Sequence, residues 1–139
     1  MIITAHSHPR AGLIGNPSDG YFGKTISVIV RNFSATITLF ESPRLTIFPQ
    51  RPDRAGFINI EDLVSDVRLN GYYGGIRLIK ASIKKFYDFC QEGGVELPDR
   101  SFSIEYDSDI PVRVGMAGSS AIVTATLKGL MEFYEVGIP

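Results

Sequence analysis

The stretch Ile110-Pro111-Val112-Arg113-Val114-Gly115-Met116-Ala117-Gly118-Ser119-Ser120-Ala121 joins an expected strand to an expected helix. Three of its residues have little or no side chain, so a ligand could approach the backbone closely at Gly115, Ala117 and Gly118. Ser119 and Ser120 could cap the helix or offer hydroxyl groups. The amides of a helix's first turn lack intrahelical partners and lie at the positive end of the helix dipole, which attracts phosphate. Spacing alone leaves two interpretations open, a phosphate-binding loop and a plain loop with a serine N-cap and no ligand.

Hydrophobic patterns on both sides of this stretch predict one strand and two helices. Phe102 to Tyr106 alternates between apolar and polar residues, as a half-buried strand does. Each helix is predicted from apolar residues that recur along its length: Ile76, Ile79, Ile83, Phe86 and Cys90 in the first, and Ile122, Ala125, Gly129, Met131 and Phe133 in the last. Gly93-Gly94 should end the first helix, and Gly137 should be the C-cap of the last.

The first third of the chain is predicted to be rich in strands. One or two are expected within residues 1–14, and three more at 24–30, 35–41 and 45–48, which together suggest an antiparallel meander. Residues 15–20 and 49–56 are expected loops, and residues 60–69 a short helix. Because strands lead and helices follow, the pattern favours an α+β fold.

Composition excludes several functional classes. The 139 residues fit one domain, with 44% hydrophobic and 21% charged residues. A net charge of −1 gives no electrostatic case for nucleic acid or an anionic membrane as a partner. Cys90 is the single cysteine, so no intrachain disulfide can form. No signal peptide or membrane-spanning run is recognised, and a cytoplasmic location is expected.

One segment imitates a different nucleotide-binding motif. Gly20-Tyr21-Phe22-Gly23-Lys24-Thr25 ends like a P-loop, but Ser18 stands where the first glycine of that motif is needed. The motif also needs a helix after its lysine, whereas the residues after Lys24 predict a strand. A P-loop NTPase is therefore disfavoured.

Two motifs in order resemble those of the kinase superfamily named after galactokinase, homoserine kinase, mevalonate kinase and phosphomevalonate kinase (GHMP kinases). The first is Pro9 to Asp19, and the second is the glycine- and serine-rich stretch Pro111 to Ala121. Within the superfamily, residues 13–27 and 115–123 most closely resemble the glucuronokinases. The resemblance covers nearly the whole chain, as the N-terminal part of such a kinase.

The resemblance implies a fold and a set of roles. The fold would be the N-terminal α+β domain of these kinases, similar to the second domain of ribosomal protein S5, with a mixed sheet and helices on one face. The loop that would wrap the phosphates of ATP consists of Gly115, Met116, Ala117, Gly118, Ser119 and Ser120. Ser119 matches a serine that contacts Mg²⁺ in the family, although Gly118 replaces the serine that usually precedes it.

The first motif is implied to contact the acceptor. Arg10 matches an arginine near the reacting hydroxyl, and Asp19 matches an aspartate that binds sugar hydroxyls in galactokinases. Asn16 and Pro17 replace the Glu-His of galactokinases, which points away from galactose. Asn16 and Asp19 are the expected substrate residues.

The resemblance also implies that parts of the kinase are missing. The catalytic aspartate, the acidic magnesium ligand and the third motif of the family would follow Pro139, so residues 1–139 are expected to be an ATP-binding domain without its C-terminal domain. The parent protein would convert glucuronate to glucuronate 1-phosphate with ATP, while this chain alone would be nearly inactive. The alternative is a non-catalytic domain that acts through self-association or protein interaction over an exposed apolar face.

Several other residues keep two interpretations. His6 and His8 could form half a metal site but are expected to be ordinary surface or loop histidines. Asp107 and Asp109 are expected in a turn, with metal binding as the alternative. Tyr72-Tyr73 could form a wall for adenine or a packed turn. Lys24 could meet an acidic sugar or simply end a strand in solvent, and Cys90 is expected in the core.

Overall fold

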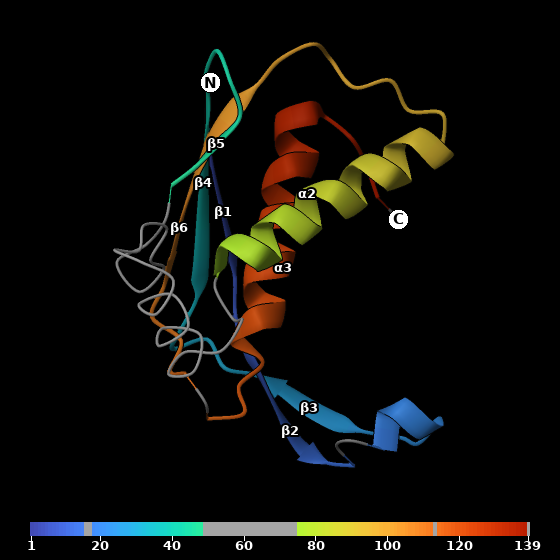
Figure 1. Cartoon of the computed structure of the whole chain (residues 1–139). Coiled ribbons are helices and arrows are strands. Elements are labelled where there is room, and N and C mark those ends of the chain that lie inside the picture. Colours follow the sequence, from blue (N-terminus) through green and yellow to red (C-terminus); the bar gives the residue numbers. More distant parts are fainter. Residues whose placement is uncertain (16–17, 49–74, 113, 139) are drawn as a thin grey trace, which may run out of the picture.

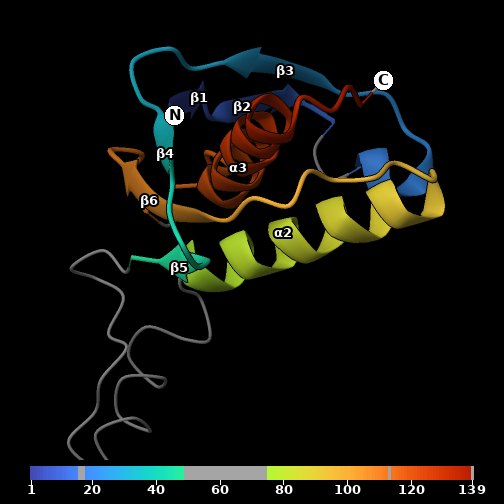
Figure 2. The ribbon, with the colours of Figure 1, turned by 90° about the horizontal axis from the view of Figure 1, so that it is seen from above.

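The hydrophobic core lies between a four-stranded sheet and two helices that cover one of its faces. The computed structural model describes residues 1–15, 18–48, 75–112 and 114–138. The sheet has the order β1-β4-β6-β5, formed by β1 (Ile2–Ser7), β4 (Ala35–Glu41), β6 (Phe102–Ser108) and β5 (Thr46–Ile47). Figures 1 and 2 show α2 (Gly75–Glu92) and α3 (Gly118–Tyr134) on the same side of this sheet. The predicted α+β class is confirmed.

Alternation along the strands decides which side chains enter the core. In β4, every second residue from Ala35 is buried, because side chains of a strand point in turn to opposite faces. The neighbours β1 and β6 pair antiparallel with β4, whereas β5 pairs parallel with β6. The sheet is therefore mixed. Its fully buried aliphatic residues include Ile37, Leu39 and Ile104, which pack against Ile79 and Leu130 of the helices.

The predicted antiparallel meander is wrong. The strand expected at residues 24–30 is β3 (Ile26–Ile29), and it pairs with β2 (Arg10–Ile14) in a separate two-stranded sheet. β4 pairs instead with β1 and β6, which are distant in sequence. Alternating hydrophobicity indicates which face of a strand is buried, but it carries no information about which strand lies beside it.

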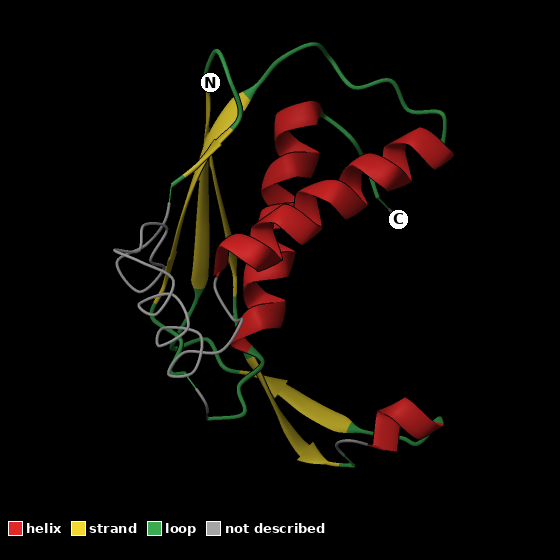
Figure 3. Ribbon diagram, in the orientation of Figure 1, coloured by secondary structure: helices red, strands yellow, loops and turns green. Residues whose placement is uncertain are grey.

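Strands β2 and β3 form a hairpin that projects from the body of the domain, as Figures 1 and 3 show. Its tip holds a short 3₁₀ helix, η1 (Ser18–Tyr21), which is closed by hydrogen bonds at Ser18. The Ser18 N–H donates to Gly15 O at 2.6 Å, and the Gly23 N–H donates to Ser18 O at 2.8 Å. Gly15 has φ +83°, and a Cβ there would lie 2.3 Å from Lys24 O, so this turn needs glycine.

Both long helices were predicted, but the end of the last one differs from the prediction. α2 ends at Gly93-Gly94 as expected, and the Val95 N–H donates to Cys90 O at 2.8 Å. α3 ends at a left-handed C-cap at Glu135, not at Gly137. The Val136 N–H closes this cap by donating to Met131 O at 2.9 Å. Glycine is the usual residue for such a conformation, but the packing of Phe133 and Tyr134 fixes the helix end two residues earlier.

Two predicted features lie outside the described residues, namely the loop at 49–56 and the short helix at 60–69. In the described part of the chain, neither helix combines the length and the apolar character that crossing a membrane requires.

Helix α3 approaches the sheet closely at Gly129. A Cβ at this position would lie 2.4 Å from Leu39 Cδ1, and Leu39 is fully buried. We expect Gly129→Val to lower the free energy of unfolding by about 1–3 kcal/mol, because the added methyl groups overpack the core. Urea denaturation measures this change. Thr124→Val is the matched control on the exposed side of the same helix, and it should stay within about 0.5 kcal/mol of the wild type. Equal effects of the two substitutions would contradict the packing described here.

Candidate nucleotide site

The loop between β6 and α3 is anchored at its start by Asp109. The Asp109 N–H donates to Ser34 O at 3.3 Å, and its Oδ1 accepts from the Ser34 N–H at 2.7 Å. The next residue, Ile110, is buried in a small cluster with Ala35 and Ala121, against which Met116 also packs. Asp109 therefore acts as a turn residue that fixes the loop, and the alternative of a metal ligand finds no support.

The backbone at the other end of the loop has the shape of an anion-binding nest. Gly115 and Ala117 both have left-handed conformations, with φ of 76° and 52°. Helix α3 then begins at Gly118, so a left-handed residue is followed directly by a right-handed one. Such a pair turns successive N–H groups toward one concave side. The amides of Ala117, Gly118 and Ser119 form this nest, which we call the cradle.

The amides of the first helical turn are available to a ligand. In the described part of the chain, no protein group accepts a hydrogen bond from the N–H of Gly118, Ser119 or Ser120. The first amide of α3 that has a partner is that of Ala121, which donates to Ala117 O at 3.2 Å. These free donors lie at the positive end of the α3 dipole.

The interpretation of this segment as a loop with a serine N-cap is wrong. The N-cap of α3 is Ala117, and no side chain caps the helix. Ser119 and Ser120 follow inside the first turn, where both are exposed. Among the described residues, neither hydroxyl has a hydrogen-bond partner, so both remain able to contact a phosphate or a cation.

Strand β2 brings Arg10 beside this loop. The Arg10 N–H donates to Met116 O at 3.2 Å, and Nη1 of its guanidinium donates to Ser27 Oγ of β3 at 3.1 Å. Figure 1 shows the loop at the base of the hairpin, next to the start of α3. The two segments singled out in the sequence therefore meet at one backbone hydrogen bond.

Other predicted site residues lie farther from the cradle or outside the described residues. Asp19 belongs to η1 at the tip of the hairpin, whereas Arg10 is the first residue of β2, at the base of the hairpin. Asn16 and the pair Tyr72-Tyr73 lie outside the described residues.

Sequence reasoning missed one residue at this site, Ser27, and one contact of a residue that it did include, Met116. Ser27 accepts from the Arg10 side chain, and the carbonyl of Met116 accepts from the Arg10 amide. Both depend on the pairing of β2 with β3 and on the path of the loop. A serine in an alternating strand and a carbonyl in a glycine-rich loop give no signal of such contacts in the sequence.

His6 and His8 each contact a nearby protein group. His6 Nδ1 lies 2.9 Å from Thr36 Oγ1, and the Nδ1 of His8 donates to Phe33 O at 2.9 Å. No group of three or more His, Cys, Asp or Glu side chains in the described residues could hold a metal.

Lys24 precedes strand β3, which excludes the P-loop interpretation. Cys90 is buried in the core as predicted, and burial raises the pKa of its thiol.

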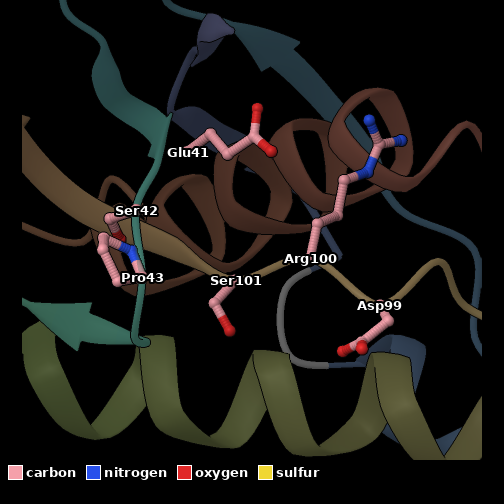
Figure 4. A pocket seen from close by; sticks show the side chains of 6 residues that line it. All are labelled: Glu41, Ser42, Pro43, Asp99, Arg100 and Ser101. Carbon is pink, nitrogen blue, oxygen red and sulfur yellow. The ribbon is translucent and has the colours of Figure 1, made fainter.

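A hollow of about 470 Å³ lies at the opposite end of the sheet from the cradle, where β4 ends and β6 begins. Figure 4 shows its lining residues Glu41, Ser42, Pro43, Asp99, Arg100 and Ser101. The Arg100 guanidinium pairs with Glu135 at 3.2 Å and lies 5.0 Å from the centre of the Phe133 ring. Its backbone carbonyl accepts from the hydroxyl of Tyr134 at 3.1 Å, and burial raises the pKa of that phenol. Arg100 therefore ties down the end of α3.

Comparisons with known proteins agree on one family. Residues 77–139 match the family model of the GHMP kinases N terminal domain. Two Arabidopsis thaliana proteins are similar over nearly the whole chain: "Probable glucuronokinase 2", 45% identical over 97% of this chain, and "Glucuronokinase 1", 43% identical over 96% of it. The matched part is 37% of each relative. The structure of Lactococcus lactis galactokinase complexed with galactose shares the fold, with a TM-score of 0.71 and 16% identity over 99% of this chain and 34% of that one.

Ala117 holds its left-handed conformation against a steric penalty, since a Cβ in this region crowds the following carbonyl. We expect Ala117→Gly to raise the free energy of unfolding by about 0.5–1 kcal/mol, because the relief of strain exceeds the cost in backbone entropy. Chemical denaturation measures the change. Ala81→Gly, at an exposed position inside α2, is the same substitution in a right-handed residue and should destabilise by about 1 kcal/mol. A loss of stability in both variants would argue against the left-handed conformation at residue 117.

Proposed function

Because the chain belongs to the GHMP kinase superfamily, we propose that its parent protein transfers the γ-phosphoryl group of ATP to a sugar or sugar acid. Glucuronate is the proposed acceptor and glucuronate 1-phosphate the product, in line with the names of the Arabidopsis relatives. The observation that carries the proposal is the cradle, whose partnerless amides open the first turn of α3 beside Arg10.

The proposed roles follow from the chemistry of each group. The amides of residues 117–119 and the small side chains around them hold the phosphates of ATP, with Gly115, Met116 and Ser120 completing the loop. The Ser119 hydroxyl contacts Mg²⁺. Arg10 stabilises negative charge near the reacting hydroxyl, while Asp19 and Asn16 bind sugar hydroxyls. Bound ATP with Mg²⁺ supplies the phosphoryl group, and the contribution of these residues is positioning and electrostatic stabilisation.

The chain spans about 37% of the length of the curated relatives that it matches. We propose that residues 1–139 form the N-terminal, ATP-binding domain and that the catalytic base and the acidic magnesium ligand come from the remainder of such a kinase. This domain alone would then have very little activity, since phosphoryl transfer needs all of these groups together. A cytoplasmic setting, with ATP and the sugar as partners, completes the proposal.

Removing the Ser119 hydroxyl tests the nucleotide site. We expect Ser119→Ala to weaken binding of ATP with Mg²⁺ about tenfold, which corresponds to the loss of one charge-assisted contact. Isothermal titration calorimetry of the 139-residue chain measures the affinity. Lys24→Ala is the control and should leave it unchanged. A protein of the relatives' length that contains this domain should also phosphorylate glucuronate in a panel of sugars, and turnover on none of them would refute the proposed substrate class.

A second candidate function is self-association through the β2–β3 hairpin. The register pairs Ile14 with Ile26 and Ala11 with Val28, so these four side chains share one face of the hairpin. Ile14 and Ile26 are 67% and 57% exposed. Tyr21 and Phe22 at the tip are also exposed, and each aromatic ring can bury about 150–250 Å². Together these residues provide an area of the order of the roughly 800 Å² that each partner buries in a standard interface.

Replacing one residue of this apolar face tests the second candidate. We expect the wild-type chain to dimerise with increasing concentration and Ile26→Asp to remain monomeric, because a buried carboxylate opposes the contact. Light scattering over a concentration series measures the mass. Ile2→Asp is a matched control, since Ile2 is 76% exposed on β1 away from the hairpin, and it should behave like the wild type. A wild-type chain that stays monomeric at high concentration would rule out this function.

A further inference from the structure

The hydrogen bond from the Arg10 N–H to Met116 O lies between the two halves of the proposed site. Met116 is fixed in two ways, because its side chain packs against the cluster of Ala35, Ile110 and Ala121 and its carbonyl accepts from β2. Its neighbours Gly115 and Ala117 are both left-handed. The peptide bond between Met116 and Ala117 is therefore held in one orientation, just before the backbone changes from left-handed at Ala117 to right-handed at Gly118.

The direction of this peptide decides where the cradle opens. In a planar trans peptide, the C=O and the following N–H point in opposite directions. Because Met116 O points to β2, the N–H of Ala117 points away from β2. The left-handed Ala117 and the right-handed Gly118 then align the next two amides with it. Rotation of this one peptide would turn the first donor of the cradle toward the hairpin and remove it from the nest.

We propose that the main-chain amide of Arg10 is a positioning group for the phosphate-binding cradle, a role separate from that of its side chain. The inference rests on the proposed function. One residue then joins the two reactants, because its guanidinium serves the acceptor while its amide orients the loop that holds the donor. The guanidinium of Arg10 and the cradle are therefore connected through the backbone of one residue, and no flexible segment lies between them.

Proline substitution can separate the two roles of Arg10. In the antiparallel pair of β2 and β3, the Val30 N–H donates to Pro9 O. Because successive residues of such a strand point their backbone N–H and C=O groups alternately toward and away from the partner strand, the Arg10 N–H points away from β3. A proline at residue 10 therefore removes the bond to Met116 without removing a bond between the two strands. Arg10→Pro and Arg10→Ala both lack the guanidinium and differ in the amide.

The experiment compares Arg10→Pro with Arg10→Ala, and not with the wild type. We expect Arg10→Pro to bind ATP with Mg²⁺ about five- to tenfold more weakly than Arg10→Ala in calorimetry. In NMR spectra, the amide resonances of residues 117–119 should have different chemical shifts in Arg10→Pro and in Arg10→Ala. Gly12→Pro is the positional control, because Gly12 is the next residue of β2 whose N–H turns outward, and it should match the wild type.

The outcomes separate this inference from the proposed function. If Arg10→Pro and Arg10→Ala have equal affinities and equal amide chemical shifts at residues 117–119, the inference is overturned. If no variant, including the wild type, binds ATP with Mg²⁺, the proposed nucleotide site fails, and the NMR comparison alone decides whether the Arg10 amide orients the loop. Resonances of the core residues Ile37, Leu39 and Ile104 must be unchanged in Arg10→Pro. A change in the core as well would mean that the substitution acts through the fold, which would also overturn the inference.

Discussion

The pairing of β4 on both of its edges is the constraint on which the remaining structure depends. Six of its seven residues pair with β1 on one side and all seven pair with β6 on the other. Its inward side chains pack against α3, which in turn packs against α2. The first residue of the strand, Ala35, is also buried beneath the loop that leads into α3. A single strand thus determines the sheet, the position of α3 and the support of the cradle.

Local elements could be predicted from the sequence, and their partners could not. The spacing of Ile79, Phe86 and Cys90 predicts α2, because a helix buries one face whatever lies against it. The alternation of residues 35–41 predicts β4 for the same reason. The sequence does not show that β2 and β3 form a sheet of their own, because an exposed strand rich in β-branched residues has the same sequence pattern as a buried one. The end of α3 at Glu135 depends on tertiary packing around Phe133.

The site shows a similar division between what is local and what is not. The small residues at 115–118 and the two serines indicate a loop that can approach phosphate, because these properties belong to the residues themselves. The absence of a serine cap could not be predicted, because the left-handed Ala117 is the N-cap and both serines fall inside the first turn. The contact of Arg10 with Met116 joins residues far apart in sequence and appears only once the strands are placed.

The hairpin is built so that its residues can vary without disturbing the core. Among the described strands, its two strands pair only with each other. Most of their side chains are exposed, and the tip is closed by its own turn at Ser18. Changes at the exposed side chains of the tip therefore carry little penalty in folding, apart from Gly15, which the turn requires. Under the proposed function, substitutions at the tip of the hairpin would change which acceptor is recognised, while the amides that hold the phosphoryl donor would stay the same.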